Sequence, residues 1–425
     1  MDTSKLKNVI LRVLRDYSSL LVSVFIGLVA VVFLVLAPLV GGKLKKKMET
    51  ESISTGKQIQ SLINSAVASD QWKIEQDYQQ AYEADANEIS FLASQSSKRQ
   101  LLSYKIFPEP KDVSTLIFEE FGRRFREQVE ELIKHINGRD CPTKAELDRS
   151  LQSTALSSSV SRVTRSPSSS VHSSGDDVKD SIIDELCQQK ALSASVYANP
   201  ADLSGYKFWS NFEYVGRDEA VEDCWFWQLG YWIYEDVFDT IKALNYRSNS
   251  VFTSPVKRLL SISFAESDVA RRGVRKTVSA DRPNYVLSSE DGLVNRPLTG
   301  RVSDEDIDVV HFKIEGLVSA KAVLLFMKQL CSEKEHKFRG FFGEQEEAIF
   351  SHNQITILES NIESLDPKDP DYEKNHGYYC YGEDAVVKLD LVCEYIFNKK
   401  SYDEIKPKSV KGEEPEEEKS AKRRP

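Results

Sequence analysis

The sequence predicts an α+β protein that is anchored to a membrane by one helix, and three observations lead to this. A stretch of 26 residues, 17–42, contains no Lys, Arg, Asp or Glu. Apolar residues then recur at helical spacing between residues 59 and 92, and the last part of the chain alternates helical patterns with strands of period two. We therefore expect a transmembrane helix, a helical stalk and a C-terminal α+β domain, in that order.

The expected transmembrane helix is residues 17–42. At a rise of about 1.5 Å per residue, the apolar run 20–40 covers roughly 30 Å, the thickness of a bilayer's hydrocarbon core. The alternative is a cleaved signal peptide, whose apolar core has about 7–15 residues and precedes a small-residue cleavage site. Here the run is longer, and it ends in Pro38, Gly41, Gly42 and a lysine cluster. An uncleaved anchor fits this pattern better.

The charges around the anchor bear on topology and on partners. Four basic residues lie on each side of the span, so charge alone does not orient it. We expect residues 1–16 to form a short cytoplasmic tail, because such tails usually stay inside while a large domain crosses. Residues 1–47 carry eight basic and two acidic side chains against a total charge of −10, which leaves the remainder at −16. This balance argues against binding to nucleic acid or to anionic lipid.

Residues 43–105 predict a coiled-coil stalk. The segment has no Pro, and its sparse apolar residues lie three, four or seven positions apart, at Ile59, Leu62, Ile63, Val67, Ile74, Tyr78, Tyr82, Ile89 and Leu92. Such a narrow stripe is typical of a helix with a partner, since a long helix is rarely stable alone. A solvated stalk is the alternative. Leu62 and Ile63 are therefore candidate partner-binding residues.

Three further segments complete the organisation outside the C-terminal domain. Residues 106–150 predict a helical segment that begins after Pro108 and Pro110. Residues 151–176 predict a Ser-rich linker, because they contain too few large apolar residues to bury a core. Residues 399–425 are charged and predict a disordered tail. The KRRP ending could suggest nuclear targeting, but solvated charge is the simpler interpretation.

Residues 177–398 predict the folded domain. Its elements are expected as helix 219–244, strands 259–264 and 308–317, helix 320–331, and strands 353–362 and 385–397. Two αββ units in tandem pack as a four-stranded antiparallel sheet with both helices on one face, a ferredoxin-like domain with permuted connections. Val310, Phe312 and Leu391 should face the helices, and the other face of the sheet should be free, with His311 exposed on it.

The helix 219–244 carries aromatic residues nearly all round. Trp225 and Trp232 lie on its main stripe, while Tyr231 and Tyr234 lie off it. Such a helix is usually buried on two sides. One side can be the sheet, and the other must be a second element or another subunit. Tyr231 and Tyr234 are therefore the second pair of candidate partner-binding residues.

No catalytic constellation emerges from the motifs. The chain has no GxGxxG, P-loop, GxSxG or HExxH sequence. No two of its six histidines share the spacing of metal ligands, and its six cysteines include no CxxC pair. We expect most of those cysteines to be buried thiols, although an oxidising compartment would permit one pair to form a disulfide. We predict no catalytic, cofactor-binding or metal-binding residue.

The plan of a short tail, one span, a coiled-coil stretch and a terminal αββαββ domain resembles the PilO/GspM-type inner-membrane components of type IV pilus and type II secretion machines. The strings FWQLGYWIYEDVFDTIKALN (226–245), SPVKRLLSIS (254–263), DVVHFKIEGLV (308–318) and YYCYGEDAVVKLDLVCEY (378–395) look like PilO-like proteins of planctomycete-type bacteria. The similarity covers residues 200–398. The chain departs from the short pilus proteins by its extra length at 106–215 and its insert at 265–303.

The resemblance implies a non-enzymatic scaffold in the bacterial inner membrane, with its bulk in the periplasm. In that family such a protein pairs with a PilN/GspL-like single-pass protein through the coiled coil and the sheet domain, and self-pairing is the other possibility. Two rival functions are a single-pass extracytoplasmic sensor or ligand-binding protein, and a membrane-anchored enzyme. A sensor needs a cytoplasmic output domain, for which residues 1–16 are too short, and an enzyme needs a pocket of convergent polar groups.

Overall fold

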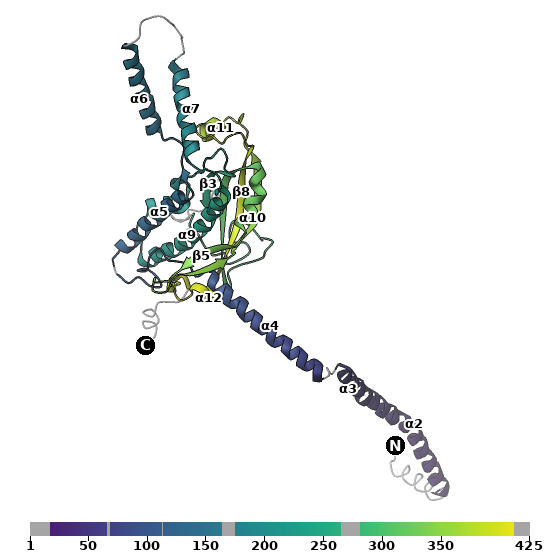
Figure 1. Cartoon of the computed structure of the whole chain (residues 1–425). Coiled ribbons are helices and arrows are strands. Elements are labelled where there is room, and N and C mark those ends of the chain that lie inside the picture. The colour runs from purple at the N-terminus through teal and green to yellow at the C-terminus, as the bar shows by residue number, and fades with distance from the viewer. Residues whose placement is uncertain (1–17, 66–68, 113, 164–174, 265–280, 412–425) are drawn as a thin grey trace, which may run out of the picture. The chain divides into compact units, whose positions relative to one another are not determined.

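The structure is a computed structural model that describes residues 18–65, 69–112, 114–163, 175–264 and 281–411 (Figure 1). It is mixed α+β, and its contacts divide the chain into two units, residues 1–86 and 87–425. The expected cytoplasmic tail, residues 1–16, lies outside the described residues.

The first unit is helical wherever it is described. It contains α2 (Ser18–Met48), the π-helical turn η1 (Glu49–Ile53), α3 (Ser54–Ser65) and the start of α4 (Ser69–Ser96). Within α2, side chains are described for residues 22–35, 37–38 and 41–48, and those of residues 22–35 are mostly exposed and apolar. Among the described residues, no helix combines the length and the hydropathy that crossing a membrane requires.

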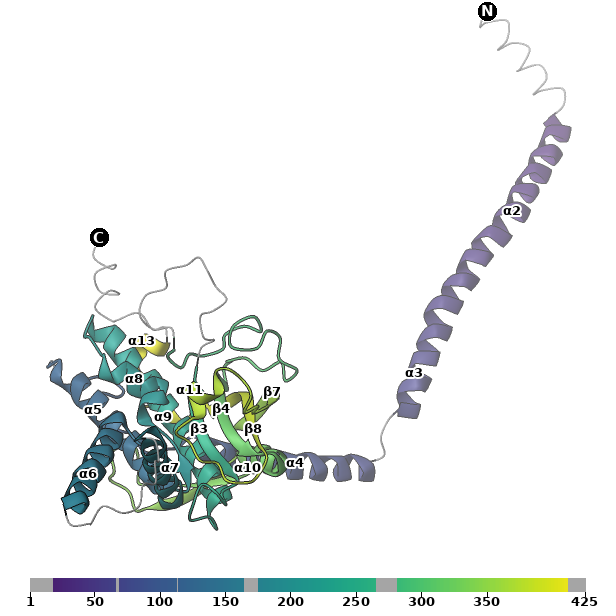
Figure 2. The same ribbon diagram turned by 90° about the horizontal axis from the view of Figure 1, so that it is seen from above.

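The second unit is built on a six-stranded mixed sheet, so the expectation of four strands was wrong. The strand order is β1 (Gly138–Arg139), β2 (Val196–Tyr197), β3 (Val256–Ser263), β4 (Ile307–Ser319), β8 (Val386–Asn398) and β7 (Ile355–Ser364). Figure 2 shows β3, β4, β8 and β7 side by side. These four pair antiparallel, as expected, whereas the short β1 and β2 extend the sheet by parallel pairing.

Helices and short elements complete this unit. The helices are α5 (Leu116–His135), α6 (Lys144–Val163), α7 (Gly175–Ser193), α8 (Ser204–Ser210), α9 (Arg217–Asn245), α10 (Val323–Leu330), α11 (Tyr372–His376), α12 (Lys399–Tyr402) and α13 (Lys408–Lys411). Two 3-10 turns are η2 (Pro200–Asp202) and η3 (Ala320–Ala322). A hairpin that the sequence did not predict, β5 (Lys334–Phe338) with β6 (Ala348–His352), lies between α10 and β7 in the chain.

One face of the sheet packs on α9 and α10, as expected. Ile241 of α9 and Phe326 of α10 meet Ile314 and Leu391 around one small cavity. Phe312, on the same face of β4, is fully buried. The period-two register predicted for β4 is therefore confirmed, and the main core of the domain lies between this face and the two helices.

The other side of α9 is covered by α5 of the same chain. The Phe125 ring lies 5.7 Å from the Trp227 ring and 6.1 Å from both the Tyr231 and the Tyr234 rings, in edge-on contacts. Tyr231 is 6% exposed and Tyr234 is fully buried. The helix is buried on two sides, as its aromatic content predicts, but its second neighbour is α5 and not another subunit.

The second face of the sheet is partly covered, which contradicts the expectation of a free face. Val286 donates its backbone N–H to the carbonyl of Val309 at 2.9 Å, so the chain after residue 281 runs along β4. Gly292 has a φ of 96° and packs so close to the imidazole of His311 that any side chain there would collide with it. His311 is consequently 3% exposed and not a surface residue.

Three predicted boundaries need correction. The stalk ends at Ser96, because residues 97–105 enter the core, where Arg99 is 3% and Leu101 is 4% exposed. The expected linker 151–176 is helical at both ends, since α6 runs to residue 163 and α7 begins at residue 175. Residues 164–174 lie outside the described part of the chain.

The expected disordered tail, 399–425, also starts as folded chain. Tyr402 and Ile405 are fully buried, and Lys406 Nζ lies 2.7 Å from Asp308 Oδ2 on β4. The Tyr402 hydroxyl donates to the same carboxylate at 2.5 Å. Residues 399–411 therefore belong to the domain, and 412–425 lie outside the described residues.

Candidate functional site: a buried polar joint after α4

The most unusual feature of the second unit is the way the chain enters it from α4. We call residues 96–102, with the side chains that bind them, the α4 joint. Ser97 Oγ accepts hydrogen bonds from the Asn398 backbone N–H at 2.9 Å and from Gln354 Nε2 at 2.7 Å. These bonds attach the residue after α4 to the last residue of β8 and to the chain just before β7.

The joint continues along α9 through its backbone groups. Trp232 Nε1 donates to the Gln100 carbonyl at 2.9 Å, and Leu102 N–H donates to Gln228 Oε1 at 2.8 Å. Gln228 is fully buried on the aromatic stripe of α9, where a polar side chain needs such a partner. The non-helical chain after α4 is thus held in the core by hydrogen bonds that substitute for those of a regular element.

Arg99 is the centre of the joint. Its Nη1 lies 2.8 Å from Asp236 Oδ1, and its Nη2 lies 3.0 Å from Glu235 Oε2. Nη1 also donates to the Tyr395 hydroxyl at 2.9 Å, and that hydroxyl donates to Asp236 Oδ2 at 2.7 Å. The guanidinium therefore joins the entering chain to α9 and to β8 in one buried network.

The charges of this network shift one another. Burial alone would raise the pKa of Asp236, but Arg99 and His352 outweigh it and hold that pKa below its usual value. Burial raises the pKa of Glu235 to about 7, against the opposing pull of Arg99. The Glu235 side chain keeps 31% of its surface exposed, so water moderates this rise.

Two histidines extend the network from Asp236 into the β5–β6 hairpin. His352 Nε2 lies 2.9 Å from Asp236 Oδ2, and its Nδ1 lies 2.9 Å from Nδ1 of His336. The other nitrogen of His336, Nε2, lies 2.8 Å from the carbonyl oxygen of Lys98. These contacts form a continuous series that runs from Asp236 through His352 and His336 to Lys98, and so leads back to the α4 joint.

An open groove of about 510 Å³ borders the joint. It is lined by Gln100, Tyr104, Lys337, Arg339 and Gly343. Both cationic side chains pair with one carboxylate, Glu347, at 2.7 Å for Lys337. Each cation that lines the groove is therefore already paired, so the lining residues present no convergent set of free charges. Among the residues that the structure describes, no three or more His, Cys, Asp and Glu side chains are arranged to hold a metal ion.

The predicted partner-binding residues divide into two groups. Leu62 and Ile63 lie on α3 and are 67% and 61% exposed. Tyr231 and Tyr234 are buried against α5, as described above, so their assignment to a partner surface is wrong. The two groups belong to different units of the chain.

Sequence reasoning missed the residues of the joint, although one signal was present. Asp236 stands one turn after Trp232 on the buried stripe of α9, and an acidic residue there needs a buried cation. That cation, Arg99, lies within residues 43–105, which the sequence pattern assigns to the stalk. His336 and His352 are on the paired strands β5 and β6, which the sequence did not predict.

Comparisons of the chain with known protein families, with curated proteins and with solved structures found no match to any of them.

Proposed function

We propose that this chain is a non-enzymatic scaffold of the bacterial inner membrane, anchored by residues 17–42, with residues 1–16 in the cytoplasm and the bulk in the periplasm. In this proposal it serves a type IV pilus or type II secretion-like machine, as the PilO/GspM-like pattern of its sequence implies. Its partner is a PilN/GspL-like single-pass protein.

The observation that carries the proposal is the α4 joint. A scaffold must pass position or force between a membrane-proximal helix and a folded domain. Here the residues directly after α4 are fixed to α9, β7 and β8 by side-chain and backbone bonds, with Arg99 only 3% exposed at their centre. A flexible linker at this place would not pass position or force from the helix to the domain, whereas the bonds of the joint can do so.

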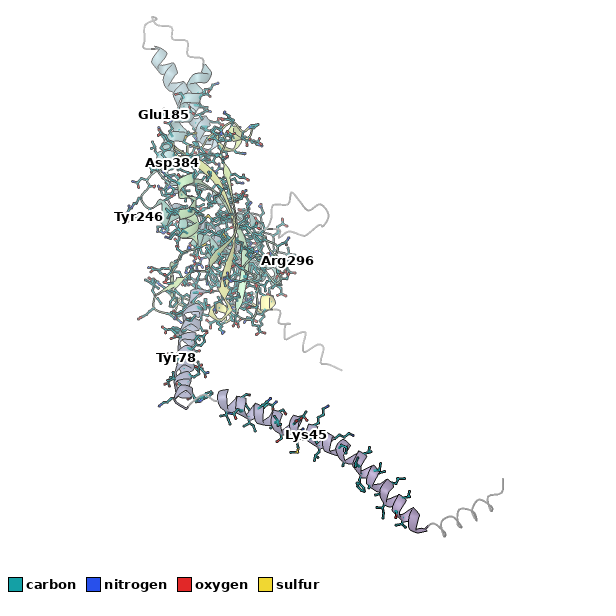
Figure 3. The ribbon with its side chains drawn as sticks, turned by 90° about the vertical axis from the view of Figure 1, so that its right-hand side faces the viewer. Lys45, Tyr78, Glu185, Tyr246, Arg296 and Asp384 are labelled. Atoms are coloured by element: carbon teal, nitrogen blue, oxygen red, sulfur yellow. The ribbon has the colours of Figure 1, made fainter. Side chains whose placement is uncertain are left out.

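The exposed apolar residues of the helices before the joint support a helical partner. Ile63, Tyr78 and Tyr82 are 61%, 69% and 78% exposed. Figure 3 shows Tyr78 projecting from α4. Apolar side chains exposed along one helix are typical of a surface that another helix covers.

The strand order of the sheet supports a permuted ferredoxin-like fold for this domain. The order β3-β4-β8-β7, antiparallel throughout, with α9 before β3 and α10 after β4, is the order that a circularly permuted ferredoxin-like unit requires. We propose that this unit is the sheet domain of the scaffold, with β1, β2 and the β5–β6 hairpin as additions to it.

Co-expression with a PilN/GspL-like single-pass protein tests the proposal. We expect a stable heterodimer that Ile63→Glu weakens at least tenfold in Kd, since one buried large apolar side chain contributes about 1.5–3 kcal/mol. Gln58→Glu, which adds the same charge to a polar position of α3, is the matched control and should leave the affinity unchanged. Deleting the gene should abolish filaments or secretion. A chain that stays monomeric, ignores this protein and is dispensable for both processes is not such a scaffold.

A further inference from the structure

The contacts of His336 and His352 require more protons than two neutral imidazoles carry. A neutral imidazole has one N–H donor and one acceptor nitrogen, whereas an imidazolium has two donors. The series of contacts that leads from Asp236 through the two histidines to Lys98 contains three short contacts, of 2.9, 2.9 and 2.8 Å, and four ring nitrogens. Each contact needs one proton, so the pair needs three.

The two groups at the ends of this series, Asp236 and the Lys98 carbonyl, cannot supply the missing proton. The Lys98 carbonyl oxygen only accepts. Asp236 is held as a carboxylate, because Arg99 lies 2.8 Å from its Oδ1 and the Tyr395 hydroxyl donates to its Oδ2. Both outer nitrogens, Nε2 of His352 and Nε2 of His336, must therefore carry a proton. The contact between the two Nδ1 atoms takes the third.

From this count we infer that His336 and His352 share a proton and carry one positive charge between them, and that this proton fastens the Lys98 carbonyl to the β5–β6 hairpin. The pair is a proton-dependent latch on the α4 joint. When it loses the shared proton, a lone pair of one ring faces either the other ring or the Lys98 oxygen, and that contact becomes repulsive. The inference does not depend on the scaffold proposal.

The charges around the pair decide whether it holds the proton. The groups that face it are Glu235, Asp236 and Asp239 on α9, Lys334 on β5, Arg99 in the joint and Tyr395 on β8. Lys334 is occupied by the carbonyls of Gln329, Leu330 and Ser332, and Arg99 by two carboxylates. Lys242 also neighbours Asp239, and Glu235, with its pKa raised to about 7, is only partly ionised at neutral pH, so Asp236 is the carboxylate that directly favours the added proton.

Burial acts in the other direction. Desolvation and the Arg99 guanidinium lower the pKa of His336, taken as a single ring, to about 4. A neutral pair, however, leaves two acceptors facing each other at 2.8–2.9 Å. The geometry supplies an acceptor at both ends of the pair and a second ring between them, and this arrangement opposes the lowering.

The protons of the pair can be counted directly. Nitrogen-15 NMR of the full chain labelled at histidine, at about pH 7, distinguishes protonated from bare ring nitrogens. A cross-peak between Nδ1 atoms of two different rings identifies the pair without any mutation. We expect three protonated nitrogens among the four of this pair. Two protonated nitrogens, or the absence of a contact between the rings, would overturn the inference.

A second experiment reads the latch through stability. The free energy of unfolding of the full chain is measured against pH in a Glu235→Gln background, because Glu235 titrates in the same range. Stability should fall as pH rises through the pKa of the pair, and His336→Phe should remove this fall, since a pKa raised by folding stabilises only while the proton is bound. His135→Gln, at an exposed position of α5, is the control and should keep it.

The alternative has the opposite sign. A neutral pair with a depressed pKa would make the same protein lose stability as pH drops below about 6.5, again only where His336 is present. That outcome, or identical pH profiles for His336→Phe and the control, would show that no shared proton holds the joint.

Discussion

Arg99 Nη1 and Asp236 Oδ1 lie 2.8 Å apart, and neither side chain exposes more than 4% of its surface. Oδ2 of Asp236 also accepts a hydrogen bond from Tyr395 and contacts His352, whereas Oδ1 is compensated by the charge of Arg99. A buried ion pair of this kind is tolerated because both charges are compensated, and it becomes costly when one partner is removed. This pair therefore controls the stability of the whole α4 joint.

Replacing Arg99 alone should destabilise the protein strongly. Arg99→Met leaves Asp236 buried without its cation, and we expect a loss of about 3–5 kcal/mol in the free energy of unfolding. Denaturant unfolding followed by tryptophan fluorescence measures it. Arg123→Met, which breaks an ion pair with Glu127 whose side chains are 61% and 55% exposed, should cost less than about 1 kcal/mol. If the two variants are equally stable, the network around Arg99 does not hold the joint.

The raised pKa of Glu235 predicts a pH dependence. Folding raises that pKa from 4.5 to about 7, so the folded protein binds a proton in this range that the unfolded chain releases. Stability should therefore fall as pH rises from 4.5 to about 7, and Glu235→Gln should reduce the slope. Glu127→Gln, at an exposed position on α5, is the control. Parallel profiles for the wild type and Glu235→Gln would contradict the assignment.

The two faces of β4 should respond differently to substitution. Phe312 is fully buried beneath α9 and α10, whereas Lys313 is 31% exposed by its side chain and pairs with Glu315. Phe312→Asp places a charge in the core and should unfold the domain, while Lys313→Gln should change its stability by less than about 1 kcal/mol. Thermal melts followed by circular dichroism compare them. Equal melting temperatures would mean that the strand register is wrong.

The C-terminal residues should divide sharply into two classes. Ending the chain after Lys411 removes only residues outside the described part, and we expect no loss of stability. Ending it after Asn398 removes Tyr402 and Ile405, both fully buried, and each contributes about 1.5–3 kcal/mol. The shorter protein should be destabilised by at least about 3 kcal/mol in denaturant unfolding. If the shorter protein is as stable as the longer one, residues 399–411 belong to a tail and not to the folded domain.

Removing residues 1–45 tests the anchor. The proposed span, residues 17–42, lies wholly within them, so the shortened protein should leave the membrane fraction and retain a cooperative thermal transition. Fractionation after a high-salt wash makes the measurement, because the wash removes electrostatic binding. Retention of the shortened protein in the membrane pellet would contradict a single anchor.

Local periodicity predicted much of the sheet domain. The alternation of Val310 and Phe312 with Lys313 identified β4 and its buried face, and helical spacing identified α9 and α10. These signals are local, so a single sequence carries them. The short β1 and β2, with two residues each, contain too little pattern to be recognised.

The candidate site was not predictable in the same way. Arg99 belongs to a polar segment, and its burial depends on Asp236, which is distant in the sequence and lies on another element. His336 and His352 meet only because β5 and β6 pair, and that hairpin is partly exposed and polar. Tyr231 and Tyr234 were misassigned for a related reason. Helical spacing shows that a second face is apolar, but it does not show that α5 covers it.

The hydrogen bond from the Asn398 N–H to Ser97 Oγ has a mechanical consequence. Asn398 is the last residue of β8, which pairs with β4 along its whole length and with β7 along much of it. A pull that enters at Ser97 is delivered to the end of that central strand. Because antiparallel hydrogen bonds run perpendicular to the strands, tension along β8 loads many of them at once, in shear, and does not peel them apart one at a time. The sheet is therefore tethered at a strand that is hydrogen-bonded to a neighbour on each side.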